Sequence, residues 1–445
     1  MKERKRFGIV LPLVLLSYFM ILLDNSVVFT STVKISQDLH MSVRALSWVS
    51  NAYVLTFGGL QLLGGRLGDL FGRKKIFLTG LALFTIFSLL VGISTNGPMI
   101  IIMRALQGIG SAILAPTTLA LLMDNYQGEM LQRGIDYYGT TAGLGASFGM
   151  LIGGLIASFT SWRVGFLMNV PIGIIIFILT SLKVREKGRT QQQSLDVWGG
   201  ILSVLGIAGI IYSINVDSYR GVALLVGILS LILFIFQERR AATPIMPLKL
   251  FNDRVRVNAY ITRFFIVGMC FTFLYLAPQL MQNLYHFTPF MASVAFLLMS
   301  VPQFIFATRV SLLAEKLSIA KVAVISAVIS VIAMLWIVLV GVQHGFWLAL
   351  AVPLVLVGIG QGFAMSPLTS LGVANTTPDI AGSASGVVNT FHQTGQSVSL
   401  AITVALTGSI SSYAKSFNMA AVVMLIYAVI ALIATSNIVR IQKVK

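Results

Sequence analysis

The sequence predicts an all-α polytopic membrane protein, a chain that crosses a lipid bilayer many times as helices. Of its 445 residues, 57% are hydrophobic and only 10% are charged, and the mean hydropathy is +0.90. A soluble globular protein carries about 25% charged residues. The chain also contains many apolar stretches of about 17–27 residues, which is the length that a helix needs to span a bilayer.

Fourteen apolar stretches are expected to be membrane-spanning helices. The expected spans are residues 9–31, 46–65, 76–95, 98–122, 134–159, 164–183, 197–215, 221–237, 258–284, 290–313, 319–341, 346–372, 381–408 and 416–438. Because this number is even, both termini lie on the same side of the membrane.

The distribution of positive charge predicts which side that is. The net charge is +17, with 31 Lys and Arg residues. Most of them fall in connections that are cytoplasmic if the N-terminus is inside, which is the bias that sets membrane topology. The opposite side receives only Lys34, Arg44, Arg163, Arg220 and Lys415. We therefore expect both termini in the cytoplasm of a bacterial cell, and a lipid rather than a nucleic-acid partner.

The two longest hydrophilic connections suggest three segments. They are residues 184–196 and 238–257, and they bracket two spans without interior acids or bases. We expect a six-helix bundle at 1–190, an inserted helix pair with its connections at 191–245, and a second six-helix bundle at 246–445. Two similar halves around a site at the membrane midplane are a common plan of secondary transporters.

A short glycine-rich basic loop lies between the second and third expected spans. Its glycines allow a tight turn, and Asp124, at the inner end of the fourth expected span, calls for a cation because a helix C-terminus disfavours an anion. We predict a cytoplasmic latch that holds the two halves together; the alternative is an ordinary basic loop that sets topology. The gating candidates are Gly65, Gly68, Asp69, Gly72, Arg73 and Asp124.

Asp24 and Arg104 are the candidate proton-coupling pair. A carboxyl group inside the membrane is costly and points to function. Helical rise places Asp24 about 22 Å into the first span and Arg104 about 10 Å from the outer face, at nearly the same depth. A desolvated carboxyl can load and release a proton, and Arg104 can favour its charged form while it lies nearby. The alternatives are a permanently paired acid and a static ion pair.

Further polar residues are candidates for weaker roles. We expect Asn51 and Tyr53 to line the cavity of Asp24 and to bind substrate together with Gln279 and Gln282. Asp136 is either a solvated helix cap or a second proton site at the inner mouth.

Two basic side chains in the second half have more than one possible role. Arg263 is interpreted as a residue that extends to the membrane interface or as a substrate ligand. His392 is a weak candidate for a second titrating group. The single cysteine, Cys270, excludes a disulfide framework.

The fifth expected span is rich in glycine, which allows close contact between membrane helices. The candidates for this packing are Gly139, Gly143, Gly149, Gly153 and Gly154. A dinucleotide loop is not expected, because no strand precedes these glycines.

Several motifs resemble those of one transporter family. Residues 65–75 resemble the G-x-L-x-D-x-x-G-R-K/R-K/R loop of the major facilitator superfamily, and 104–110 resemble its R-x-x-Q-G-x-G motif, which is linked to proton coupling. Residues 149–154 resemble the G-P-x-x-G-G antiporter motif, with Met150 in place of proline.

Together with segments 169–173 and 244–248, these motifs make the chain similar to the fourteen-helix drug:proton antiporters, which include staphylococcal multidrug exporters. The resemblance implies the major facilitator fold, with two six-helix bundles plus an inserted helix pair, and drug efflux coupled to protons.

We therefore expect a proton-coupled multidrug efflux transporter that exports lipophilic cationic or zwitterionic compounds by alternating access. No phosphate-binding G-x-x-x-x-G-K-S/T sequence occurs, and no nucleophile, base and orienting group come together. We therefore expect no enzyme activity, no metal and no cofactor besides protons, and a monomer. The alternatives are a proton-coupled transporter of one specific metabolite and a membrane receptor that transports nothing.

Overall fold

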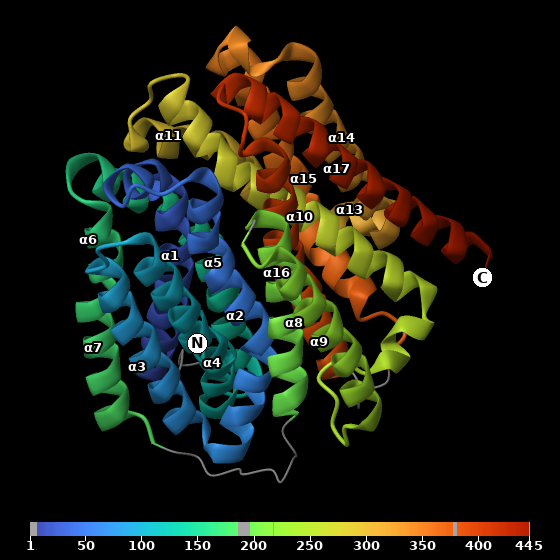
Figure 1. Cartoon of the computed structure of the whole chain (residues 1–445). Coiled ribbons are helices and arrows are strands. Elements are labelled where there is room, and N and C mark those ends of the chain that lie inside the picture. Colours follow the sequence, from blue (N-terminus) through green and yellow to red (C-terminus); the bar gives the residue numbers. More distant parts are fainter. Residues whose placement is uncertain (1–6, 186–195, 217, 377–380, 445) are drawn as a thin grey trace, which may run out of the picture. The chain divides into compact units, whose positions relative to one another are not determined.

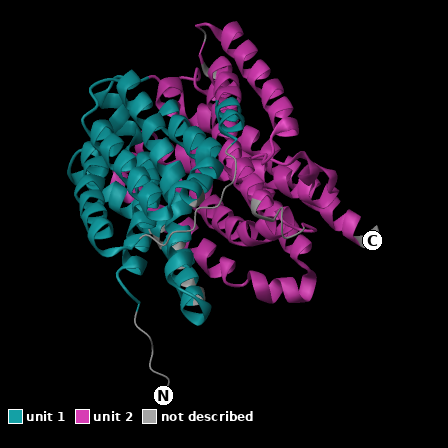
Figure 2. Ribbon diagram, turned by 90° about the horizontal axis from the view of Figure 1, so that it is seen from below, with its two compact units in different colours: residues 1–41, 48–204 teal, residues 42–47, 205–445 magenta. Residues whose placement is uncertain are grey.

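The computed structural model describes residues 7–185, 196–216, 218–376 and 381–444. Every regular element within these ranges is helical (Figure 1). The helices form two compact units, which Figure 2 shows in different colours. Unit 1 consists of residues 1–41 and 48–204, and unit 2 consists of residues 42–47 and 205–445. The expected inserted helix pair at 191–245 stays a prediction.

Unit 1 contains most of the first eight helices. They are α1 (Val10–Asp38), α2 (Val43–Phe71), α3 (Arg73–Gly92), α4 (Gly97–Asn125), α5 (Gly128–Phe159), α6 (Trp162–Leu167), α7 (Asn169–Lys183) and the first part of α8 (Val197–Asn215).

Unit 2 contains the remaining helices. They are α9 (Arg220–Arg240), η1 (Leu248–Asn252), α10 (Arg254–Asn283), α11 (Pro289–Ala295), α12 (Leu297–Ala307), α13 (Val310–Leu317), α14 (Ile319–Val340), η2 (Val342–His344), η3 (Trp347–Ala351), α15 (Val352–Gly372), α16 (Ala381–Thr407) and α17 (Tyr413–Val444).

The predicted all-α membrane architecture is confirmed. Among the described residues, 11 helices are long and apolar enough to cross a membrane. The other three expected spans, 46–65, 134–159 and 381–408, also fall on helices, namely α2, α5 and α16. The total of fourteen membrane spans stays a prediction.

Local sequence explains where several helices begin. The Asn96 side chain caps α4 by accepting a hydrogen bond of 2.9 Å from the backbone N–H of Met99, and Thr288 caps α11 in the same way with Met291 at 3.1 Å. Such caps satisfy donors that a helix N-terminus leaves free. Gly72 separates α2 from α3 with a φ of 95°. A side chain would be strained there, so this turn requires glycine.

Asp253 caps α10 and is tied to the connection before α16. Its Oδ1 accepts from the backbone N–H groups of Val255 at 2.8 Å and Arg256 at 3.0 Å, and its Oδ2 accepts from Asn375 Nδ2 at 3.0 Å. Burial opposes the charge of this carboxyl, but these hydrogen bonds outweigh the desolvation and lower the pKa of Asp253. The charged form therefore stabilises the start of α10.

Close approach of α1 and α5 depends on glycine. A Cβ atom at Gly149 would lie 2.8 Å from Ser26 Cβ, and one at Gly153 would lie 2.8 Å from Val27 Cα. Gly154 is also buried. By contrast, a Cβ at Gly139 would meet nothing within 4 Å, so the packing argument does not extend to that position. Gly143 lies outside the residues whose surroundings the structure describes.

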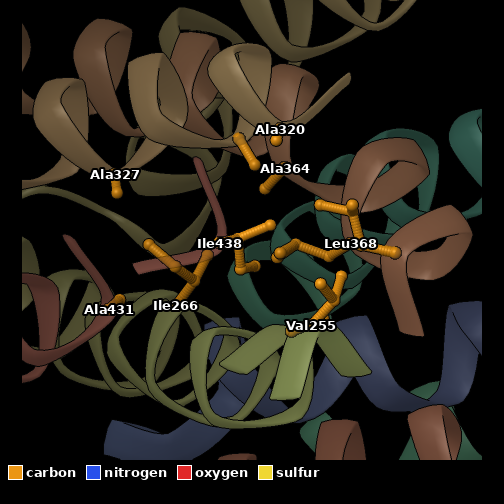
Figure 3. Close-up of a cluster of buried hydrophobic side chains, with 11 residues drawn as sticks. Val255, Ile266, Ala320, Ala327, Ala364, Leu368, Ala431 and Ile438 are labelled. Atoms are coloured by element: carbon orange, nitrogen blue, oxygen red, sulfur yellow. The ribbon is translucent and has the colours of Figure 1, made fainter. Parts of the chain in front are cut away.

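Small side chains also fill the interior of unit 2. Buried residues of α10, α14, α15 and α17 meet in one cluster, in which six alanines lie beside larger aliphatic side chains such as Ile266, Leu368 and Ile438 (Figure 3). Alanine lets membrane helices pack closely, and dispersion contacts stabilise that packing.

Candidate functional site

The carboxylate of Asp24 is the centre of a polar cluster inside unit 1. Its exposed fraction is 0%. Oδ2 accepts a hydrogen bond of 2.5 Å from Arg104 Nη1, and Oδ1 accepts from Gln107 Nε2 at 2.8 Å and from Asn169 Nδ2 at 3.0 Å. Helices α1, α4 and α7 therefore meet at one carboxylate.

Arg104, the partner of Asp24, is also buried and bonded through several atoms. Its exposed fraction is also 0%. Nε donates to the carbonyl of Val49 at 3.1 Å, and Nη1 donates to Gln107 Oε1 at 2.8 Å as well as to Asp24. Its Cζ atom lies 4.1 Å from the centre of the Tyr53 ring, a cation–π contact. The guanidinium thus ties α4 to both α1 and α2.

Two buried polar atoms of this cluster have no hydrogen-bond partner among the residues that the structure describes. They are Arg104 Nη2 and Asn169 Oδ1. Asn169 Nδ2 also donates to Ser88 Oγ at 3.0 Å, and Ser88 Oγ donates to the carbonyl of Phe166 at 2.9 Å. A free donor and a free acceptor beside a buried acid leave capacity for a proton, a water molecule or a ligand.

Burial of the Asp24–Arg104 ion pair costs free energy, so the hydrogen bonds around the pair are needed to offset that cost. Transferring a charge pair from water to a low-dielectric interior costs several kcal/mol per ion, and mutual attraction offsets this only when the remaining polar atoms are also bonded. The amides of Gln107 and Asn169 supply those bonds to the carboxylate. Protonation of Asp24 would weaken its attraction to Arg104, which can only donate. The two amides could instead turn and present oxygen to the new O–H group.

The structure places the predicted residues of this region as follows. Asp24 and Arg104 are in contact, and the Tyr53 ring packs on Arg104, while its hydroxyl is 2.7 Å from Ser111 Oγ. Asn51 is fully buried, and both polar atoms of its side chain lack a partner. Its predicted role in substrate binding is compatible with these unused hydrogen-bonding groups and stays a prediction.

Sequence reasoning did not assign Gln107 and Asn169 to the site. Both stood inside stretches used for the family resemblance, but a neutral amide in a membrane helix carries a weaker signal than a charge. That signal was nevertheless present, because an amide in an apolar span needs a hydrogen-bond partner.

The segment predicted as a glycine-rich loop is helical apart from Gly72, and Arg73, the first residue of α3, forms a second polar contact within unit 1. Arg73 Nη1 donates to Asp124 Oδ1 at 2.7 Å and to the carbonyl of Ala120 at 3.2 Å. Gly65 packs on Pro116, where an added Cβ would be 3.5 Å from the ring, and Gly68 packs on Thr117 at 3.2 Å. The pair therefore joins α3 to the inner end of α4. A latch between the two halves stays a prediction.

Other predicted residues lie elsewhere. The side chains of Asp69 and Asp136 are outside the described part of the structure. Gln279 and Gln282 lie on α10 in unit 2, and Gln279 Nε2 donates to the carbonyl of Tyr275 at 2.9 Å. Their contribution to substrate binding stays a prediction.

Known proteins resemble this chain over nearly its whole length. A family model described as Major Facilitator Superfamily matches residues 14–400 and again 259–440. The puromycin resistance protein pur8 of Streptomyces alboniger is 31% identical over 426 residues, covering 92% of this chain and 83% of that protein. The cephamycin export protein CmcT of Amycolatopsis lactamdurans is 31% identical, covering 93% of this chain and 90% of that protein.

A solved structure shows the same fold. The crystal structure of the peptide transporter POT matches with a TM-score of 0.73 and covers 99% of this chain and 97% of its own, at 14% identity. The superfamily match and the transporter relatives indicate a transporter and not an enzyme. The chain therefore belongs to the Major Facilitator Superfamily.

Proposed function

We propose that the protein is a drug:proton antiporter that exports lipophilic cationic or zwitterionic compounds across the cell membrane. The observation that carries the proposal is the fully buried Asp24–Arg104 pair with its amide shell. The names of pur8 and CmcT support export of antibiotics as the substrate class. The bias of Lys and Arg supports an orientation with both termini in the cytoplasm.

Protonation of Asp24 is the proposed coupling step. A proton that enters from outside neutralises the carboxylate, so its attraction to Arg104 falls and its hydrogen bonds rearrange. Arg104 is then left with the neutral acceptors Val49 O and Gln107 Oε1. Because a buried cation without a counter-ion is unfavourable, the protonated site favours a different arrangement of α1 and α4. That difference supplies the free energy for a conformational change.

A cationic drug competes with the proton at the same carboxylate. Drug and proton each neutralise Asp24, so binding of one weakens binding of the other. The aromatic face of Tyr53 and the free amide of Asn51 offer an apolar contact and hydrogen bonds within unit 1. Alternation of drug and proton at one site produces exchange rather than co-transport.

Reconstituted protein tests the proposal. Ethidium, a lipophilic cation, is added to proteoliposomes that contain a trapped pH indicator. We expect drug-driven proton movement with the wild type and none with Asp24→Asn. Asp38→Asn is the matched control, since Asp38 lies on the same helix but is exposed and paired with Arg163, and an exposed ion pair contributes little. Equal proton movement in wild type and Asp24→Asn contradicts the coupling role.

A second candidate is an exporter of one specific compound. The relative CmcT is named for the export of cephamycin alone, which favours this possibility. A screen of structurally unrelated drugs separates the two: proton movement with several of them supports the multidrug function, and a response to one compound class supports the specific exporter.

A further inference from the structure

Unit 2 buries an arginine that has no carboxylate partner. Arg263 of α10 is only 7% exposed. Its Nε donates to His392 Nδ1 of α16 at 3.1 Å, and its Nη1 donates to the carbonyl of Met365 at 2.9 Å and to Thr369 Oγ1 at 3.4 Å, both on α15. All of these acceptors are neutral. Among the described residues, no Asp or Glu bonds to Arg263.

This burial excludes the interpretation of Arg263 as a residue that extends to the membrane interface. Arg263 follows the first residue of α10 by nine positions, which is about 13 Å along the helix axis. A flexible basic side chain near a helix end normally keeps its charged group in water. Here three helices enclose the guanidinium instead.

His392 does not balance the charge of Arg263. Because Arg263 Nε–H donates to Nδ1, that ring nitrogen carries a lone pair, and the imidazole is neutral with its proton on Nε2. His392 Nε2 lies 3.0 Å from Gln396 Nε2, and exchange of the amide's oxygen and nitrogen, which have nearly the same shape, places an acceptor there for this proton. The Arg263, His392 and Gln396 cluster therefore keeps a full positive charge.

The other buried arginines differ in this respect. Arg104 faces the carboxylate of Asp24. Arg256, which is 5% exposed, donates to the carbonyls of Leu250, Ala374 and Asn375 and follows the helix cap Asp253 by three positions. Arg263 has fewer backbone acceptors, and its Nη2 donates to no described residue. A buried cation without a counter-ion is strongly unfavourable, and among the residues that the structure describes none supplies a counter-ion to Arg263.

We propose that Arg263 binds an anionic group, specifically a carboxylate attached to an apolar body. The planar guanidinium matches a carboxylate in shape, and Gln396 and Thr369 can supply neutral hydrogen bonds beside it. The surroundings on the same two helices are apolar, since Tyr260 and Phe391 stack with ring centres 5.3 Å apart and pack into a buried hydrophobic cluster. Unit 2 thereby carries a site of opposite charge preference to the Asp24 site of unit 1.

A polar face of α15 gives this site a route to water. Ser366, Thr369 and Ser370 are all exposed. Their spacing of three and four residues puts them on one face of the helix. Thr369 is also the residue that accepts from Arg263, so the exposed face leads directly to the guanidinium.

The anion site itself does not depend on drug transport. Only one part of the inference rests on the proposed function, namely that the bound carboxylate belongs to a transported zwitterionic or acidic compound. The anion site is therefore tested by equilibrium binding to the purified full chain, without any measurement of transport.

The probe is benzoate, and benzamide is its uncharged analogue. The effect of each on the thermal unfolding of the protein is measured at constant ionic strength. A ligand that binds only the folded protein raises its unfolding temperature with concentration, which yields an affinity. We expect saturable stabilisation by benzoate and little by benzamide. Arg263→Gln is expected to weaken benzoate binding about tenfold or more, because the lost hydrogen bonds are made to a charged group.

Two further variants keep the test decisive. Arg254→Gln removes an exposed charge from the same helix and is expected to leave benzoate affinity unchanged. If Arg263→Gln does not fold, Arg263→Lys is used instead. This variant keeps the positive charge but lacks the planar guanidinium group, so benzoate affinity is expected to fall several-fold.

Three results would overturn the proposal. They are the absence of saturable stabilisation of the wild type by benzoate, equal stabilisation by benzamide, and an affinity that falls equally in Arg254→Gln and the Arg263 variants. Drug-driven proton movement measured on the same preparations shows separately whether the Asp24 mechanism stands.

Discussion

Replacing Gly149 by alanine is expected to push α1 away from α5 and to disturb the Asp24 site. The added Cβ would lie 2.8 Å from Ser26 Cβ, 2.9 Å from Ser26 Oγ and 3.2 Å from Leu23 Cα. Ordinary contacts between carbon atoms begin at about 3.5 Å, so the closest one is short by about 0.7 Å. Overpacking of this kind typically costs about 1–3 kcal/mol.

The displacement should also affect function, because the crowded residues flank Asp24. Leu23 and Ser26 lie on α1 immediately around the carboxylate, whose three donors come from α4 and α7. A shift of about 0.7 Å is enough to weaken hydrogen bonds of this length. We therefore expect a lower unfolding temperature in detergent and slower drug-driven proton movement in proteoliposomes.

Gly139 provides a matched control on the same helix. An alanine there would meet no atom within 4 Å, and alanine favours helix more than glycine does. Gly139→Ala should therefore be as stable as the wild type or slightly more stable. Comparable destabilisation of both variants would show that the loss arises from α5 itself and not from its contact with α1.

A double mutant tests the contact directly. Ser26→Gly removes the two atoms closest to the added methyl group, and the next closest, Leu23 Cα, lies at 3.2 Å. Although Ser26→Gly alone weakens the helix, it should cost less when combined with Gly149→Ala, giving a favourable coupling energy. Additive effects of the two substitutions would refute the proposed steric contact.

The remaining predictions concern charged groups. Arg104→Ala should still insert into the membrane but lose drug-driven proton movement in proteoliposomes; normal movement would make Arg104 a purely structural residue. Arg73→Gln should slow transport without changing equilibrium drug affinity, whereas Lys75→Gln, at an exposed position in the first turn of the same helix α3, should change neither the rate nor the affinity; equal rates in both variants would remove the gating role. Asp253→Ala should lower stability by about 0.5–2 kcal/mol at neutral pH through the lost helix cap. Since the folded-state pKa of Asp253 is lowered, the stability difference between wild type and Asp253→Ala should persist above the unfolded pKa of about 3.9 and shrink as pH falls below it. Thermal unfolding across pH measures this difference. A difference that stays constant at low pH would contradict the ionic contribution.

The membrane made much of the fold predictable. Lipid requires helices of a minimum apolar length, so each expected span falls on a helix or a broken helix. Hydropathy detects only the apolar part, however. Helix α1 continues to Asp38 beyond the expected end at residue 31, and α5 begins at Gly128 rather than at 134. Helices extend past the apolar stretch because their backbone hydrogen bonds remain favourable in water as well.

Breaks within helices were not predictable from hydropathy. The span expected at 164–183 is divided into α6 and α7 around Met168, and the span at 290–313 is divided among α11, α12 and α13. Pro302 inside α12 was visible in the sequence, but the break after Ala295 follows from packing. Apolar composition alone does not distinguish a straight helix from a broken one.

The candidate site was predictable in part. Charge inside the membrane is rare, so Asp24 and Arg104 stood out, and equal depth placed them together. Asn169 did not stand out, because its contact with Asp24 depends on the rotation of α7 about its axis. The burial of Arg263 was also missed, since its sequence position near the start of a span suggested an interfacial location.

The most direct test of the central claim counts protons released when drug binds. Purified protein in weakly buffered detergent solution is titrated with ethidium while a pH indicator and drug fluorescence are recorded together. At a pH at which Asp24 is protonated before drug is added, shared occupancy of Asp24 predicts release of a proton with each drug bound by the wild type. Asp24→Asn is expected to bind drug without proton release. Equal proton release from both proteins would contradict the assignment of coupling to Asp24.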